Sequence, residues 1–84
     1  MALQSSSAPT SVLHLEGLNC PLPLLKTKLA LKQTQLDEIV EVWATDAGSY
    51  QDFPIYFATT KHTLLECKVL KTGYYFKIKS AGGN

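Results

Sequence analysis

Apolar and polar positions follow two different periods along the first half of the chain. The segment SVLHLEG alternates between apolar and polar residues, which predicts a short strand with one buried face that ends at Gly17. After Pro21 the period becomes helical, because leucines recur on one stripe at Leu22, Leu25, Leu29 and Leu36. The stripe predicts an amphipathic helix that begins at Pro21, buries these leucines and ends near Thr34 or Leu36.

The second half of the chain carries the signals of a strand, a helix and a hairpin. The segment DEIVEVWATD has the β-branched and aromatic composition of a strand. AGSYQDFP is typical of a helix start, with either Ser49 or Asp52 in a capping position, and this helix is expected to end near Lys61 or His62. TLLECKVLKTGYYFKIKS alternates on both sides of a turn at Thr72–Gly73, which predicts a β-hairpin.

Together these elements predict an α+β fold with the order β-α-β-α-β-β. The simplest architecture is a two-layer sandwich, in which two helices cover one face of a mixed four-stranded sheet. The 84 residues are enough for one domain, which we place at residues 12–80. Residues 1–11 are rich in small polar residues and predict a flexible N-terminal tail, and residues 81–84 predict a C-terminal tail.

Composition narrows the function classes. The net charge is only +1 and the chain has no arginine, which argues against a nucleic-acid reader, as does the lack of a clear aromatic stacking platform. The first residues show no secretory signal, and no segment is apolar over the length of a membrane span. We therefore expect a cytoplasmic protein, in which the two cysteines, Cys20 and Cys67, stay reduced.

Cys20 stands directly before Pro21 and Pro23, at the predicted start of the first helix. As the N-cap of that helix it would face the first-turn N–H groups and the positive end of the helix dipole, which favour a thiolate and lower the pKa of the thiol. The two prolines fix the backbone around it. This pattern favours a reactive, exposed thiol; the alternative is a small buried apolar residue.

Several chemistries do not fit Cys20. Pro23 stands where a Cys-x-x-Cys redox motif would have its second cysteine. His14 and His62 lie too far away in the sequence for metal-ligand spacing, so neither a metal nor another cofactor is expected. No residue is clearly placed as the base that a hydrolase nucleophile requires.

Other polar and sulfur-bearing positions each allow two interpretations. Cys67 alternates with apolar neighbours and is expected to pack in the core, although it could instead resolve a disulfide with Cys20. His62 is expected at the surface or at a helix C-terminus rather than as a base. His14 is expected to be exposed, and Asp46 is expected to stabilise a turn.

Leu24 and Leu31 lie off the main leucine stripe of the first predicted helix. They could widen its buried face. They could equally form an exposed apolar strip near Cys20 that docks partner proteins.

The segment LHLEGLNCPLPLLKTKLALKQ resembles the signature of the TusA/SirA-like sulfur carriers, which have a Gly-Leu-x-Cys-Pro-x-Pro motif. VEVWATDAGSYQDFP, KHTLLE and YYFKIKS are similar to later segments of that family, so the resemblance covers about residues 12–80. It implies the β-α-β-α-β-β sandwich and a sulfur relay in which Cys20 carries sulfane sulfur as a persulfide. In that relay Gly17, Pro21 and Pro23 shape the site.

The resemblance also implies partners. A donor protein of the cysteine desulfurase or rhodanese type would load Cys20, and an acceptor protein would unload it. The carrier would be sulfurtransferase-like rather than a stand-alone enzyme, and it would serve tRNA thiolation, molybdenum cofactor, sulfur oxidation or thiosulfate use. A link to a membrane sulfur transporter is a further expectation, without insertion of the chain itself into the membrane.

The absence of a second cysteine near Cys20 suits such a relay. A neighbouring thiol would attack the persulfide, release sulfide and close a disulfide. Three rivals remain at this point. They are a ubiquitin-like carrier that uses the Gly82–Gly83 segment as a thiocarboxylate, a regulatory or protein- or RNA-binding module, and a thiol redox sensor.

Overall fold

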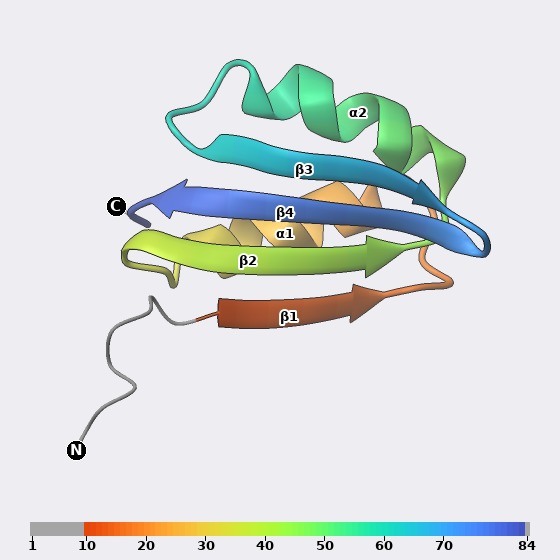
Figure 1. Cartoon of the computed structure of the whole chain (residues 1–84), viewed down its shortest axis with the longest axis horizontal. Helices are drawn as coiled ribbons and strands as arrows, with labels where there is room; N and C mark the ends of the chain where they lie inside the picture. Colours follow the sequence, from red (N-terminus) through yellow and green to blue (C-terminus); the bar gives the residue numbers. More distant parts are fainter. Residues whose placement is uncertain (1–9, 84) are drawn as a thin grey trace.

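A computed structural model describes residues 10–83 of the chain (Figure 1). Its elements, in order, are β1 (Thr10–Leu15), α1 (Leu22–Leu31), β2 (Leu36–Ala44), α2 (Ala47–Phe57), β3 (Thr63–Leu70) and β4 (Gly73–Ala81). The predicted α+β class and the order β-α-β-α-β-β are confirmed.

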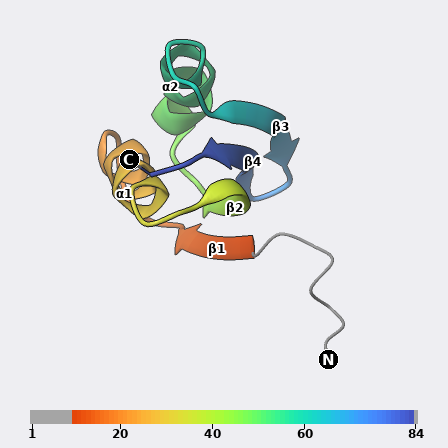
Figure 2. The same ribbon diagram turned by 90° about the vertical axis from the view of Figure 1, so that its left-hand side faces the viewer.

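The four strands form one mixed sheet in the order β1-β2-β4-β3. β1 runs parallel to β2, whereas β4 runs antiparallel to both β2 and β3. A parallel pair needs a crossover connection, and α1 supplies it. Figure 2 shows both helices on the same side of the sheet, as the sequence predicts.

The core lies between the sheet and the helices, and alternate side chains of the central strands point into it. Val40 and Val42 of β2 and Phe76 and Ile78 of β4 are fully buried, because every second residue of these central strands faces the helices. Phe53 of α2 stacks on Phe76 with ring centroids 4.1 Å apart. This contact fixes α2 over the centre of the sheet.

The leucine stripe of α1 faces outward, and the prediction that it is buried is wrong. Leu22, Leu25 and Leu29 are exposed, and Leu29 keeps 63% of its surface accessible. Leu36 is not in the helix; it is the exposed first residue of β2. The helix also ends earlier than predicted, at Leu31.

The buried face of α1 consists of Pro23, Thr27 and Leu31, which recur every fourth residue. Thr27 can be buried because its hydroxyl donates to the carbonyl oxygen of Pro23 at 2.8 Å, so no polar group is left unpaired. Leu31 is 2% exposed and Leu24 packs against the core. These two leucines therefore widen the buried face, and their alternative role as an exposed strip is wrong.

Asp46 caps α2, so neither Ser49 nor Asp52 is the capping residue. The Asp46 carboxylate accepts a hydrogen bond from the backbone N–H of Ser49 at 3.1 Å. This is the N-cap geometry that satisfies a free donor of the first turn. The expected turn role of Asp46 is confirmed, and α2 ends at Phe57, some residues before the predicted position.

The first and last strands extend beyond the predicted domain at both ends. β1 begins at Thr10, and β4 continues to Ala81. The backbone N–H of Gly83 then donates to the carbonyl oxygen of Thr34 at 2.9 Å. Residues 1–9, most of the predicted N-terminal tail, and residue 84 lie outside the described residues, so the division into tails and domain stays a prediction.

The face of the sheet opposite the helices carries a row of aromatic side chains that the sequence did not reveal. His14 stacks near Trp43, and Trp43 packs on Tyr75 with ring centroids 4.7 Å apart. The Tyr75 hydroxyl donates to the Glu41 carboxylate at 2.8 Å. The parallel and antiparallel registers place these residues side by side. The low net charge and the lack of arginine are the arguments that remain against RNA binding.

No helix in the described part of the chain is long and apolar enough to cross a membrane.

Candidate functional site

Cys20 lies exposed in the turn that joins β1 to α1. The N-cap of α1 is Pro21, not Cys20, so that prediction is wrong by one residue. The peptide bond between Cys20 and Pro21 is cis. The turn closes through the backbone N–H of Leu22, which donates to the carbonyl oxygen of Asn19 at 2.9 Å. The thiol is therefore carried on a short, hydrogen-bonded segment just before the helix.

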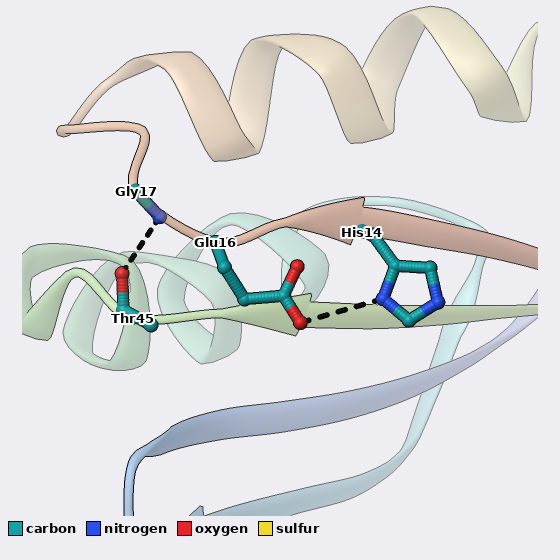
Figure 3. A network of polar contacts seen from close by, with 4 residues as sticks. All are labelled: His14, Glu16, Gly17 and Thr45. Atoms are coloured by element: carbon teal, nitrogen blue, oxygen red, sulfur yellow. Dashed lines mark hydrogen bonds and ion pairs between the residues drawn. The ribbon is translucent and has the colours of Figure 1, made fainter.

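Gly17 ties this turn to the end of β2. Its φ of +85° lies in the left-handed region, which glycine adopts without steric cost. Its backbone N–H donates to the hydroxyl of Thr45 at 2.9 Å (Figure 3). Because β1 and β2 are parallel and pair Leu15 with Ala44, their ends meet at this point. The backbone conformation of Gly17 and this bond join the turn to β2, and its support of the site stays a prediction.

The two motif prolines occupy different environments. Pro21 is exposed, and its carbonyl oxygen accepts the first helical hydrogen bond, from Leu25 N–H at 3.0 Å. Pro23 is the second residue of α1 and is fully buried. Pro21 thus shapes the helix start, while Pro23 anchors it to the core.

The start of α2 forms the other side of the site. The Cys20 thiol donates to the carboxylate of Asp52 at 3.2 Å. Gly48 lies against the cysteine, because a Cβ added to it would be 3.1 Å from the Cys20 Cβ and 3.4 Å from the Cys20 Sγ. The same Cβ would be 2.8 Å from the carboxylate of Asp46. The thiol is therefore held between the two helix starts, beside two carboxylates.

These carboxylates reverse the expected electrostatics. The pKa of the Cys20 thiol is raised, chiefly by its hydrogen bond to Asp52, then by desolvation, and then by the negative charges of Asp52 and Asp46. The prediction of a lowered pKa is therefore wrong. It considered the dipole of α1, whereas the residues in contact with the sulfur come from α2. The hydrogen bond to Asp52 therefore favours the protonated form of the Cys20 thiol.

The comparison with known families covers this whole arrangement. Residues 11–80 match the model of a family described as sulfurtransferase TusA. The chain belongs to the TusA family. The matched residues include the Cys20 turn and all strands and helices except the first residue of β1 and the last residue of β4. Family membership supports a role in sulfur carriage.

Named relatives agree with the family assignment. The sulfur carrier protein TusA of Allochromatium vinosum is 38% identical over 69 residues, which are 82% of this chain and 91% of that protein. A putative sulfur carrier protein of Neisseria meningitidis serogroup A is 42% identical over 57 residues, 68% of this chain and 77% of its own length. A putative sulfur carrier protein of Bacillus subtilis is 40% identical over 55 residues, 66% of this chain and 73% of its own length.

Cys67, the second cysteine of this TusA family member, is half-buried. It lies in β3 opposite Phe76 and packs against the core cluster, as predicted. Burial raises the pKa of its thiol. Both cysteines are free, and Cys67 has the environment of a packing residue rather than of a reactive one.

His62 is not a base for Cys20. Its Nδ1 accepts a hydrogen bond from the backbone N–H of Ala81 at 3.0 Å. It lines a hollow together with Lys28 of α1 and Lys32, the C-cap of that helix. The ten residues of α1 span about 15 Å, and Cys20 precedes its other end.

His14 is exposed, as predicted, and its Nδ1 lies 3.3 Å from the Glu16 carboxylate (Figure 3). No group of three or more His, Cys, Asp or Glu side chains within residues 10–83 is placed to bind a metal ion.

Sequence reasoning missed two contacts of the thiol. Asp52 lies 32 positions from Cys20 and appeared only as a possible helix cap. Gly48 appeared only within the segment AGSYQDFP, which is typical of a helix start. A glycine in the first turn of a helix is a signal of close approach by another group, although it does not say which group.

Proposed function

We propose that this chain is a sulfur-relay protein that carries sulfane sulfur as a persulfide on Cys20 and passes it to a partner protein. The observation that carries the proposal is the placement of Cys20 in a TusA-family fold: its thiol is exposed, fixed between two helix starts, and has no second cysteine within its turn. A donor protein of the cysteine desulfurase or rhodanese type loads this thiol.

The chemistry of a relay matches this placement. A persulfide's outer sulfur moves when another thiol attacks it, in a reaction akin to thiol–disulfide exchange. The carrier's sulfur must therefore reach into a partner's site, which exposure allows. The other cysteine, Cys67, packs against the core from β3 and does not present its sulfur in the same way.

Two rival functions are less well supported. A thiol redox sensor needs a low pKa, since oxidation follows thiolate character, whereas the contact with Asp52 raises the pKa of Cys20. A thiocarboxylate carrier needs a free glycine segment. Gly83 instead donates to Thr34 and is packed against the backbone of Leu31 and Lys32.

Mass spectrometry tests the proposal. After incubation with a cysteine desulfurase and cysteine, or with a rhodanese and thiosulfate, the wild-type protein should gain the mass of one sulfur atom, and a thiol reductant should remove it. Cys20→Ser should gain none, whereas Cys67→Ser, the matched control, should gain as much as wild type. No adduct with either donor, or an adduct that survives in Cys20→Ser, contradicts the proposal.

The acceptor decides which pathway the relay serves. tRNA thiolation, molybdenum cofactor, sulfur oxidation and thiosulfate use are the candidate destinations. Proteins trapped as mixed disulfides with Cys20 in cells would identify the acceptor, and the same trap on Cys20→Ser gives the background.

A further inference from the structure

We propose that Asp52 is a catalytic residue of the sulfur transfer, which takes the proton of the Cys20 thiol as that sulfur attacks and returns it to the sulfur that leaves. This inference rests on the proposed function of Cys20. It is carried by one direct contact: the thiol donates to the Asp52 carboxylate across 3.2 Å.

The contact is built into the fold. Asp52 lies on α2, which is capped by Asp46 and fixed to the sheet by the stacking of Phe53 on Phe76. Phe53 directly follows Asp52 in the helix, so the carboxylate is carried by an element with a buried anchor. Gly48 leaves room for the cysteine on the same helix. The contact joins residues 32 positions apart, and it is held by the turn before α1 on one side and by α2 on the other.

Asp52 is also free to act. Within residues 10–83, ion pairs form at Glu16, Asp37 and Glu66, and neither Asp46 nor Asp52 takes part in one. Asp52 is half-buried as a residue, and its hydrogen bond with the thiol lies at the surface, where a partner protein can reach it. A charged acceptor makes a stronger hydrogen bond than a neutral one and holds the thiol proton in a fixed direction.

The loading step balances as follows. The Cys20 sulfur forms a bond with the outer sulfur of the donor persulfide, R–S–SH, and the bond between the donor's two sulfurs breaks. The electron pair of that bond stays on the donor sulfur, which leaves as R–S⁻. The Cys20 proton passes to Asp52 and then to R–S⁻, so the products are the Cys20 persulfide and R–SH. No oxidant or reductant is consumed.

The unloading step is the same reaction in reverse with a new thiol. The acceptor thiol attacks the outer sulfur, and its proton passes through Asp52 to the leaving sulfur of Cys20. A carrier must run both directions, so one group that serves as base and then as acid satisfies both halves. The carboxylate is restored after each transfer.

The Asp52→Asn variant separates this role from a structural one, because two reactions of Cys20 should change in opposite directions. Reaction with iodoacetamide expels iodide, which needs no proton. Loss of the negative charge lowers the pKa of Cys20, so this rate at neutral pH should rise by roughly threefold or more, and its pH midpoint should fall. Transfer from glutathione persulfide expels a thiolate, and that rate should fall by about a hundredfold.

The measurements are made on the full chain in a Cys67→Ser background, so that Cys20 is the only thiol. Asp52→Glu, which restores a carboxylate, should recover most of the transfer rate. Asp37→Asn is the matched control, since it removes one acidic charge at the opposite end of β2 from Asp46 and should change neither rate. Circular dichroism checks that each variant is folded.

Each outcome has one meaning. Wild-type protein that takes no sulfur from glutathione persulfide or from a cysteine desulfurase overturns the proposed function itself. Wild-type protein that takes sulfur while Asp52→Asn takes it equally fast leaves that function intact and overturns the role of Asp52. A folded Asp52→Asn that is slower in both reactions shows a positional defect only, and also overturns it.

Discussion

Gly48 lies so close to Cys20 that a methyl group on residue 48 would crowd the cysteine. A Cβ on residue 48 would lie 3.1 Å from the Cys20 Cβ and 2.8 Å from the Asp46 carboxylate. The first of these distances is tight and the second is shorter than any normal contact. The glycine therefore sets how closely the start of α2 approaches the thiol.

Gly48→Ala should slow sulfur transfer without loss of stability. Alanine favours the helix over glycine by up to about 1 kcal/mol, which offsets the strain of the new contact. Displacement of Cys20 from Asp52 by a fraction of an ångström should lower the transfer rate by roughly tenfold. Persulfide transfer and thermal unfolding are measured together.

Ala47→Ser is the control for Gly48→Ala, because residue 47 lies in the same turn and is exposed. It should transfer sulfur at the wild-type rate. Equal rates in Gly48→Ala and wild type would show that the contact between residue 48 and the cysteine has no influence on the site.

His62 should make the stability of the fold depend on pH. Burial lowers the pKa of His62 below its ordinary value, and its Nδ1 must be unprotonated to accept from Ala81 N–H. The folded protein thus binds this proton less tightly than the unfolded chain does. The stabilising contribution is fully present above about pH 6.5, the unfolded value, and is lost as the pH falls through the lower folded pKa.

Urea unfolding of wild type and His62→Asn at about pH 7.5 and about pH 5 measures this effect. The asparagine Oδ1 takes the place of Nδ1 as acceptor and does not titrate. Between the higher and the lower pH, the free energy of unfolding of wild type should fall by about 1 kcal/mol more than that of the variant. Parallel losses in both proteins would mean that His62 does not titrate in this range.

The two faces of α1 should respond in opposite ways to the same substitution. Leu31 is 2% exposed and Leu29 is 63% exposed, two positions apart on one helix. Leu31→Ala should cost about 2–5 kcal/mol of unfolding free energy, because it removes buried surface and leaves a cavity. Leu29→Ala should change it by no more than about 0.5 kcal/mol. Chemical denaturation of both variants measures the two changes. Similar losses of unfolding free energy would mean that Leu29 is buried, as the sequence pattern predicted.

The two central strands, β2 and β4, were predictable from the sequence because each buries one face. The alternation of apolar and polar residues around Val40, Val42, Phe76 and Ile78 indicates the buried face directly. The two helices occupy the segments between the strands. The orientation of α1 was not predictable in the same way. Its leucines occur on more than one side, and the residue at the centre of the buried face is Thr27, whose burial depends on a hydrogen bond to Pro23.

The site was predictable only where it is local. Cys20 and its prolines stand together in the sequence, and the glycine of that segment predicted a turn. The group that controls the thiol comes from a different helix, 32 residues away, and its contact follows from how α2 packs on the sheet. The dipole of α1 can be predicted from one segment of the sequence. The position of the Asp52 charge, which outweighs the dipole at Cys20, can be known only from the folded structure.

The two cysteines should differ in reactivity in the folded protein and become alike when it unfolds. Cys20 is exposed, whereas Cys67 packs against the core in β3 and burial raises its pKa. A neutral alkylating reagent at about pH 8 should therefore modify one thiol quickly and the other at least about tenfold more slowly. In Cys20→Ser the fast reaction should disappear, and in Cys67→Ser it should remain. In urea both thiols should react at one rate, and mass spectrometry of peptides assigns each adduct. Fast reaction of Cys67 in the folded protein would contradict its role in packing. It would also show that Cys67 is accessible enough to attack the persulfide as a resolving thiol.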